Sequence, residues 1–195
     1  PDIILTNTVL FIKEPNSLHH VTYHQDATYM GLEPQESLTA WIALTESTRK
    51  NGCVRMIQGS HLLDIQQHID TFGEDNILTR GQEIENIDEE RALDIELEPG
   101  QMSLHHARTI HGSRPNQTAA RRIGIALQSF AHPSTRQVHG EDYALLVRGS
   151  DDYGNFIKGP RPKAEVDLAN VEFRNKVNAR LSEILYAGAE KQRGY

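Results

Sequence analysis

Apolar and polar residues alternate over many short segments of the chain, and this alternation predicts β-strands. Residues 37–45 give the clearest case, because Leu38, Ala40, Ile42 and Leu44 alternate there with Thr, Trp and Ala. Side chains two positions apart lie on the same face of a strand, so each such segment has one face for the core. Similar segments, several bounded by Asn-Gly or Pro-Gly turn signals, recur at residues 3–13, 54–57, 92–97, 101–107 and 122–130.

Only two regions have the spacing of a helix. Residues 167–185 repeat apolar side chains every three to four positions, and residues 64–94 are expected to be helical in part. Strands and helices therefore do not alternate along the chain, as they would around a parallel sheet. The pattern predicts a mainly β fold, an antiparallel sandwich or jelly roll, with a C-terminal helix.

The charge of the chain is concentrated in one segment. Residues 64–94 contain ten acidic residues and two arginines, whereas the whole chain of 195 residues has a net charge of -7. The remainder is close to neutral and has no basic stripe, so we do not expect a nucleic acid partner. We expect residues 1–195 to form one domain, in which residues 61–91 are an insertion or lid with a solvated acidic surface.

Several features bear on where the protein works. No apolar run approaches twenty residues and no charged-then-apolar leader is present, so we expect no membrane span and no export signal. The single cysteine, Cys53, cannot form an internal disulfide, which favours the cytoplasm and a role as a small buried side chain. The chain begins at Pro1 without a methionine, and we expect an N-terminal piece to be missing. The sequence contains no signal for a particular oligomeric state.

Two His-x-Asp pairs are candidate metal ligands. His24 and Asp26 fall in a segment predicted to be extended, where residues two apart point to the same side and can reach one ion. His68 and Asp70 lie in the acidic segment, where helical geometry would separate the two side chains. The first pair is therefore the better candidate, and the second is interpreted as a chance match.

A third ligand and an anion-binding residue lie further along the chain. His111 follows a predicted strand, and two histidines with one carboxylate form the facial triad of non-haem iron oxygenases. Arg122 opens a strand with one apolar face of Ile and Leu, which we expect to pack. The other face consists of Arg122, Gly124, Ala126 and Gln128, which leaves space for a ligand, and an arginine fork suits a carboxylate.

Taken together, these motifs resemble the phytanoyl-CoA dioxygenase-like branch of the iron(II)/2-oxoglutarate-dependent dioxygenases. The resemblance implies a double-stranded β-helix, a cupin-like jelly roll, with Fe(II) bound by His24, Asp26 and His111. Members of this family usually have an N-terminal helical portion, which this chain largely lacks. The matching segments are residues 11–15, 24–26, 39–44, 51–53, 58–61 and 110–113, together with Asn116 and Arg122.

The resemblance also assigns the cosubstrate site and the chemistry. Arg122 and Ser113 would hold the distal carboxylate of 2-oxoglutarate, Trp41 would lie beside this cosubstrate, and O2 would be the second cosubstrate. Halogenases of the family replace the acidic ligand with a small residue. Asp26 is present here, so the expected reaction is hydroxylation of an unactivated C–H bond, with release of succinate and CO2; another oxidation such as desaturation is not excluded.

Some residue roles and some functions remain open. Candidate substrate contacts are Thr28, Tyr29, Met30, Gln128 and His106, which are equally compatible with packing. Lys13 could pair with a substrate anion, although a lysine at the end of a strand is usually solvated. The first alternative function is a cupin-like metal-binding protein or isomerase without O2 chemistry, and the second is a degenerate binding module. Because the acidic segment would repel the phosphates of CoA, we expect a small-molecule substrate without CoA.

Overall fold

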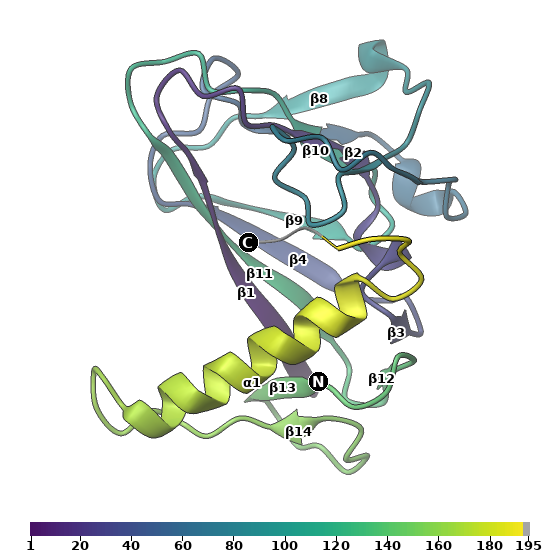
Figure 1. Cartoon of the computed structure of the whole chain (residues 1–195), viewed down its shortest axis with the longest axis vertical. Coiled ribbons are helices and arrows are strands. Elements are labelled where there is room, and N and C mark those ends of the chain that lie inside the picture. The colour runs from purple at the N-terminus through teal and green to yellow at the C-terminus, as the bar shows by residue number, and fades with distance from the viewer. Residues whose placement is uncertain (193–195) are drawn as a thin grey trace.

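Two β-sheets form the body of the computed structural model, which describes residues 1–192 (Figure 1). The larger sheet has six strands in the order β14-β13-β1-β11-β4-β9, and all but the β13–β14 pair are antiparallel. Its strands are β1 (Ile3–Lys13), β4 (Leu38–Ala43), β9 (Met102–His106), β11 (Arg122–Ala131), β13 (Tyr143–Arg148) and β14 (Ile157–Lys158).

The smaller sheet has four antiparallel strands in the order β2-β10-β5-β8. These strands are β2 (Val21–His24), β5 (Val54–Ile57), β8 (Ala92–Ile95) and β10 (His111–Ser113). The two sheets pack through a buried cluster in which Val54 of β5 contacts the layer of Trp41, Ala43 and Ala126. Two further ribbons pair β3 (Leu32–Glu33) with β12 (Arg136–Gln137) and β6 (Ile69–Asp70) with β7 (Gln82–Glu83).

The predicted strands at residues 3–13, 37–45, 54–57, 92–97, 101–107 and 122–130 all correspond to strands of the two sheets. The helical expectation for residues 64–94 is wrong, because this segment contains β6, β7, the start of β8 and one short 3-10 turn, Glu89–Arg91. Tertiary contacts explain the difference, because the backbone of this segment forms hydrogen bonds with β2 and with the residue that precedes β2. Ile84 N–H donates to Tyr23 O, and Ile77 N–H donates to His20 O.

The predicted C-terminal helix is α1 (Leu168–Leu185), the one α-helix in the described part of the chain. Asp167 caps its N-terminus by accepting a hydrogen bond from Ala169 N–H at 3.1 Å. The helix lies beside β13 and β14 (Figure 1), where the Phe173 ring meets Tyr143 edge-on at 5.0 Å. No helix in residues 1–192 is long and apolar enough to cross a membrane.

The predicted ligand face of β11 does line a cavity, through Arg122, Ala126 and Gln128, whereas the Ile and Leu face, which was predicted to pack, is only partly covered. The face of Arg122, Gly124, Ala126 and Gln128 is the buried one, whereas the face of Ile and Leu is only half-buried. The space above Gly124 is filled by protein, because a Cβ at this position would overlap the indole of Trp41. Small residues on β11 therefore admit the tryptophan ring, and the free space lies further along the same face.

Candidate metal centre

His24 and Asp26 project from the end of β2. Strand β2 stops at His24, and Asp26 begins a 3-10 turn, so the pair lies at a strand end and not within a strand as predicted. Gln25 between them keeps an extended backbone, φ -117° and ψ 125°, which still directs the two side chains to one side. The Gln25 amide points the other way and is fixed by Arg108 O and Gln66 N–H, both at 2.8 Å.

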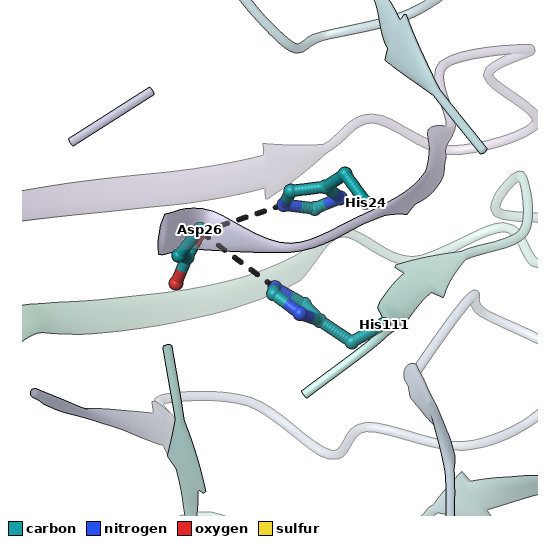
Figure 2. A group of neighbouring side chains, drawn as sticks. All are labelled: His24, Asp26 and His111. Atoms are coloured by element: carbon teal, nitrogen blue, oxygen red, sulfur yellow. Dashed lines mark ion pairs between the residues drawn. The ribbon is translucent and has the colours of Figure 1, made fainter. Parts of the chain in front are cut away.

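His111 lies directly across from His24, because the two residues are paired in the β2–β10 ladder. The neighbouring strand, and not a strand of the facing sheet, therefore brings the second histidine to the site. One ligand atom from each of His24, Asp26 and His111 lies within 4.8 Å of the others. Both imidazoles point toward Asp26 in Figure 2, with Nε2 to Oδ1 distances of 3.5 Å for His24 and 3.9 Å for His111.

The tautomer of both histidines follows from their backbone contacts. Nδ1 of His24 lies 2.9 Å from Thr22 O, and Nδ1 of His111 lies 2.9 Å from Thr109 O. A carbonyl oxygen can only accept, so each Nδ1 carries the proton and each Nε2 presents a lone pair toward Asp26. This is the second contact that metal-binding histidines usually make, and it fixes the ring orientation.

The protonation states also suit a divalent cation. Burial lowers the pKa of His111 to about 3, with a further contribution from the neighbouring His24, so the ring is neutral at physiological pH. Burial alone would raise the pKa of the Asp26 carboxyl, but the surrounding histidines, His111 first, hold it well below its usual range. A neutral imidazole at His111 and an ionised carboxylate at Asp26 are the forms in which these ligands bind a metal.

A buried arginine and a buried lysine lie near the metal centre. Arg122 is 1% exposed and Lys13 is fully buried, and no acidic side chain in residues 1–192 forms an ion pair with either of them. Two guanidinium nitrogens of Arg122, Nε and Nη1, have no hydrogen-bond partner in the described part of the chain. Its guanidinium stacks on the Trp41 ring at 5.1 Å. The site is therefore built for an anion that the protein itself does not supply.

Of the two interpretations of Lys13, solvation at a strand end is wrong. The last position of β1 is buried, and the Lys13 side chain is inaccessible to solvent. Its Nζ donates to Ser113 Oγ at 2.6 Å and to Arg114 O. Ser113, which was predicted to act with Arg122 alone, is therefore also hydrogen-bonded to Lys13. Burial and then the charge of Arg122 lower the pKa of Lys13 to about 6.

A cavity of about 50 Å³ is lined by the histidines of the metal centre and by Arg122. Tyr29 and Gln128, two of the predicted substrate contacts, line this cavity. Thr28 and Met30 do not: Thr28 is exposed, and Met30 packs in the hydrophobic core with Ile4. Other residues that line the cavity are His24, Asp26, Thr39, Trp41, His111 and Arg122.

Strand alternation on β9 places His105 in the cavity and turns His106 away. His106 Nε2 lies 3.2 Å from Glu36 Oε2 near the surface, and His106 is not among the residues that line the cavity. His105 is 6% exposed, lines the cavity, and has no hydrogen-bond partner for either ring nitrogen among the described residues. The alternation of β9 could have indicated it, because a buried face that includes Ser103 and Ala107 also includes residue 105.

His68 is not a ligand of this centre, in agreement with its interpretation as a chance match, but it supports the centre. Its Nδ1 lies 2.8 Å from Gln66 O, and its Nε2 accepts a hydrogen bond from Gln25 N–H at 3.0 Å. The ring therefore holds the backbone between His24 and Asp26. Asp70 is directed elsewhere and pairs with Arg80 at 2.5 Å.

Comparison with known proteins identifies the family. The profile of the phytanoyl-CoA dioxygenase (PhyH) family matches residues 4–124, which include all three candidate ligands and both cations. The chain belongs to the phytanoyl-CoA dioxygenase family. Dependence on iron and 2-oxoglutarate fits this family, and the predicted fold and family resemblance are confirmed.

Individual relatives support the assignment. A "Probable alpha-ketoglutarate-dependent hypophosphite dioxygenase" of Stutzerimonas stutzeri is 31% identical over 76% of this chain and 54% of its own length. A phytanoyl-CoA dioxygenase of Arabidopsis thaliana is 28% identical over 64% of this chain and 43% of its own length. The chain thus spans about half the length of these PhyH relatives.

Solved structures share the fold. The non-heme monooxygenase ThoJ in its apo form superimposes with a TM-score of 0.83 at 36% identity, covering 96% of this chain and 68% of that one. EvdO2 from Micromonospora carbonacea var. aurantiaca, solved with 2-oxoglutarate, has a TM-score of 0.57 at 24% identity, covering 79% of this chain and 58% of that one. The sandwich described above is therefore the jelly roll of PhyH-like oxygenases.

Proposed function

We propose that this protein is an Fe(II)- and 2-oxoglutarate-dependent dioxygenase that hydroxylates an unactivated C–H bond of a small molecule. One observation carries the proposal: a buried His-Asp-His cluster opens onto a cavity that is also lined by Arg122, a buried cation without an acidic partner. A metal-binding protein or isomerase without O2 chemistry has no need of such a cationic pocket beside its metal.

The residues present fit both the metal and the cosubstrate. The Nε2 lone pairs of His24 and His111, together with the ionised Asp26, form a donor set for a divalent cation that leaves coordination positions open. Two buried nitrogens of the Arg122 guanidinium, Nε and Nη1, have no partner among the described residues, and a guanidinium is well suited to bind a carboxylate. A dicarboxylate that spans the cavity would satisfy the metal at one end and the guanidinium at the other.

Each side chain then has a definite role. His24, Asp26 and His111 hold the iron, Arg122 and Lys13 bind the distal carboxylate of 2-oxoglutarate, and the Ser113 hydroxyl, which already accepts from Lys13, has its own proton to donate. The Trp41 ring supports the guanidinium from below and excludes water. Iron and 2-oxoglutarate, when bound, supply the oxidation of a C–H bond by O2, with succinate and CO2 as coproducts.

The substrate is proposed to bind in the part of the cavity near Tyr29 and Gln128. Asn7 Nδ2 donates to Gln128 Oε1 at 3.1 Å, which leaves the amide nitrogen of Gln128 available as a donor. We propose residues 61–91 as a lid, supported by Leu78, which lines the cavity from this segment. A small metabolite without CoA is the substrate class that fits an acidic lid of this kind.

The proposal is tested without O2. Fe(II) and then 2-oxoglutarate are added to the purified protein, and the weak visible charge-transfer band of the chelate is recorded for wild type, Asp26→Ala and Arg122→Leu. We expect a band in the wild type, its loss in Asp26→Ala, and a shift to higher 2-oxoglutarate concentration in Arg122→Leu. A folded, iron-loaded wild type without a band would refute the proposal in favour of a metal site without this chemistry.

A further inference from the structure

Both carboxylate oxygens of Asp26 accept hydrogen bonds from residues outside the His-Asp-His cluster. The Tyr29 hydroxyl donates to Oδ1 at 3.0 Å, and the Thr39 hydroxyl donates to Oδ2 at 3.2 Å. Oδ1 is also the oxygen that faces Nε2 of His24 and of His111. The two oxygens are therefore unequal: Oδ1 faces the candidate metal position, and Oδ2 is directed to the six-stranded sheet.

The two donors are fixed by different parts of the fold. Thr39 lies on β4, pairs with His105 across the β4–β9 ladder, and is 4% exposed. Tyr29 follows the 3-10 turn that begins at Asp26 and is 8% exposed. Burial, and then the charge of Asp26, raise the pKa of Tyr29 well above its ordinary value, so its hydroxyl stays protonated and acts as a donor.

We propose that Thr39 and Tyr29 are positioning residues that restrict Asp26 to a single metal-binding oxygen, Oδ1. The inference rests on the proposed function for its consequence, because 2-oxoglutarate and O2 together require three positions on the iron. A carboxylate that coordinates through both oxygens would occupy one of these positions. The Thr39 hydroxyl keeps Oδ2 engaged with the sheet and thereby leaves the position free.

The alternative state follows from removal of that hydroxyl. Nε2 of His105 lies 3.9 Å from Oδ2, too far for a hydrogen bond, whereas the Thr39 hydroxyl lies at 3.2 Å. Without Thr39 the buried Oδ2 would have no hydrogen-bond donor, and turning toward the metal would be its best remaining interaction. Tyr29 acts on the other oxygen, where its hydrogen bond draws electron density away from Oδ1.

The decisive variant is Thr39→Val, which has nearly the same shape but no hydroxyl, and Thr39→Ser is its matched control. Co(II) alone is added first, and its visible spectrum and dissociation constant are measured; 2-oxoglutarate is titrated afterwards without O2. We expect Thr39→Val to bind Co(II) within about threefold of wild type, with a visible spectrum that differs from that of wild type because the second oxygen of Asp26 replaces another ligand. We expect 2-oxoglutarate to bind roughly tenfold more weakly, and Thr39→Ser to restore both readouts.

Each other outcome has a defined meaning. If Thr39→Val weakens Co(II) and 2-oxoglutarate binding equally, Thr39 only supports the fold and the proposal is wrong. An unchanged Co(II) spectrum would also overturn it. If the wild type does not bind 2-oxoglutarate, the proposed function fails, but the Co(II) spectrum still tests the restriction of Asp26 independently.

Tyr29→Phe provides a second test that does not depend on the folding of a Thr39 variant. Loss of its hydroxyl leaves Oδ1 more electron-rich, so the charge-transfer band of the Fe(II) chelate should move to longer wavelength. A band at the wild-type position in folded Tyr29→Phe would overturn the role of Tyr29.

Discussion

The two faces of the six-stranded sheet differ in a way that hydrophobicity does not predict. On β11 the inner face carries Arg122, Gly124, Ala126 and Gln128, and it is buried. The outer face is apolar and half-buried, and one row of it runs across four strands as Leu10, Ile125, Ile42 and Met102. Leu10 and Met102 in this row are 55% and 54% exposed.

The difference shows that the site determines which face is buried. Burying Arg122 and Lys13 without acidic partners costs free energy, because both lose hydration. The apolar rows of the outer face, in contrast, would gain free energy if they were buried. The inner face is thus specialised for an anion, and four substitutions test this comparison from the largest expected effect to the smallest.

Arg122→Leu should have the largest effect on the inner face. The side chain offers two unpartnered N–H groups to the carboxylate, so its loss should weaken 2-oxoglutarate binding roughly a hundredfold or more, with metal affinity unchanged. Calorimetry in the presence of Co(II) measures both constants. The control is Arg121→Leu, since Arg121 is exposed and pairs with Glu14 at 2.8 Å. Equal losses in the two variants would contradict the assignment.

Gly124→Ala should destabilise the protein more than any conservative change on the outer face. The added Cβ overlaps the Trp41 indole, and we expect a loss of about 1–3 kcal/mol in the free energy of unfolding. Urea denaturation measures the loss. Ile125→Val, the neighbour on the half-buried face, should cost less than about 1 kcal/mol. A smaller loss for Gly124→Ala than for Ile125→Val would show that the ring moves freely.

Lys13 should make both stability and cosubstrate binding depend on pH. Its pKa is lowered from 10.5 to about 6, so between these values the unfolded chain holds a proton that the folded protein lacks. Stability from this residue therefore rises with pH across that window. A bound carboxylate raises the pKa of Lys13 again, so 2-oxoglutarate should bind with uptake of a proton near pH 8.

Calorimetry in buffers of different ionisation enthalpy measures this proton uptake. Lys13→Met should abolish the uptake and weaken 2-oxoglutarate binding roughly tenfold. The same uptake in wild type and Lys13→Met would assign the proton to another group.

Leu104→Gln on the outer face should have the smallest effect. Leu104 is 59% exposed, and its substitution should change the free energy of unfolding by less than about 0.5 kcal/mol and leave 2-oxoglutarate binding unchanged. Urea denaturation and calorimetry measure the two quantities. A large loss of cosubstrate affinity would show that the outer face also affects the anion-binding site, which would contradict the proposed difference between the two faces.

The sequence alone determined the local elements and the chemistry of the site residues. The strands at residues 3–13 and 122–130 and the helix at residues 167–185 follow from periodicity, since successive side chains of a strand or helix must take fixed directions. The His24-Gln25-Asp26 spacing survives the change from strand to 3-10 turn because Gln25 alone has to be extended.

Only the tertiary structure decided burial and partners. Lys13 is buried because β1 pairs with β11 up to its last residue, opposite Arg122. His105, rather than His106, enters the cavity because the pairing of β9 with β4 determines which side chains of β9 face the cavity. Thr39 reaches Asp26 across two sheets, and Trp41 fills the space above Gly124. These contacts join residues far apart in the chain, and periodicity carries no information about such pairs because it records only the direction of each side chain.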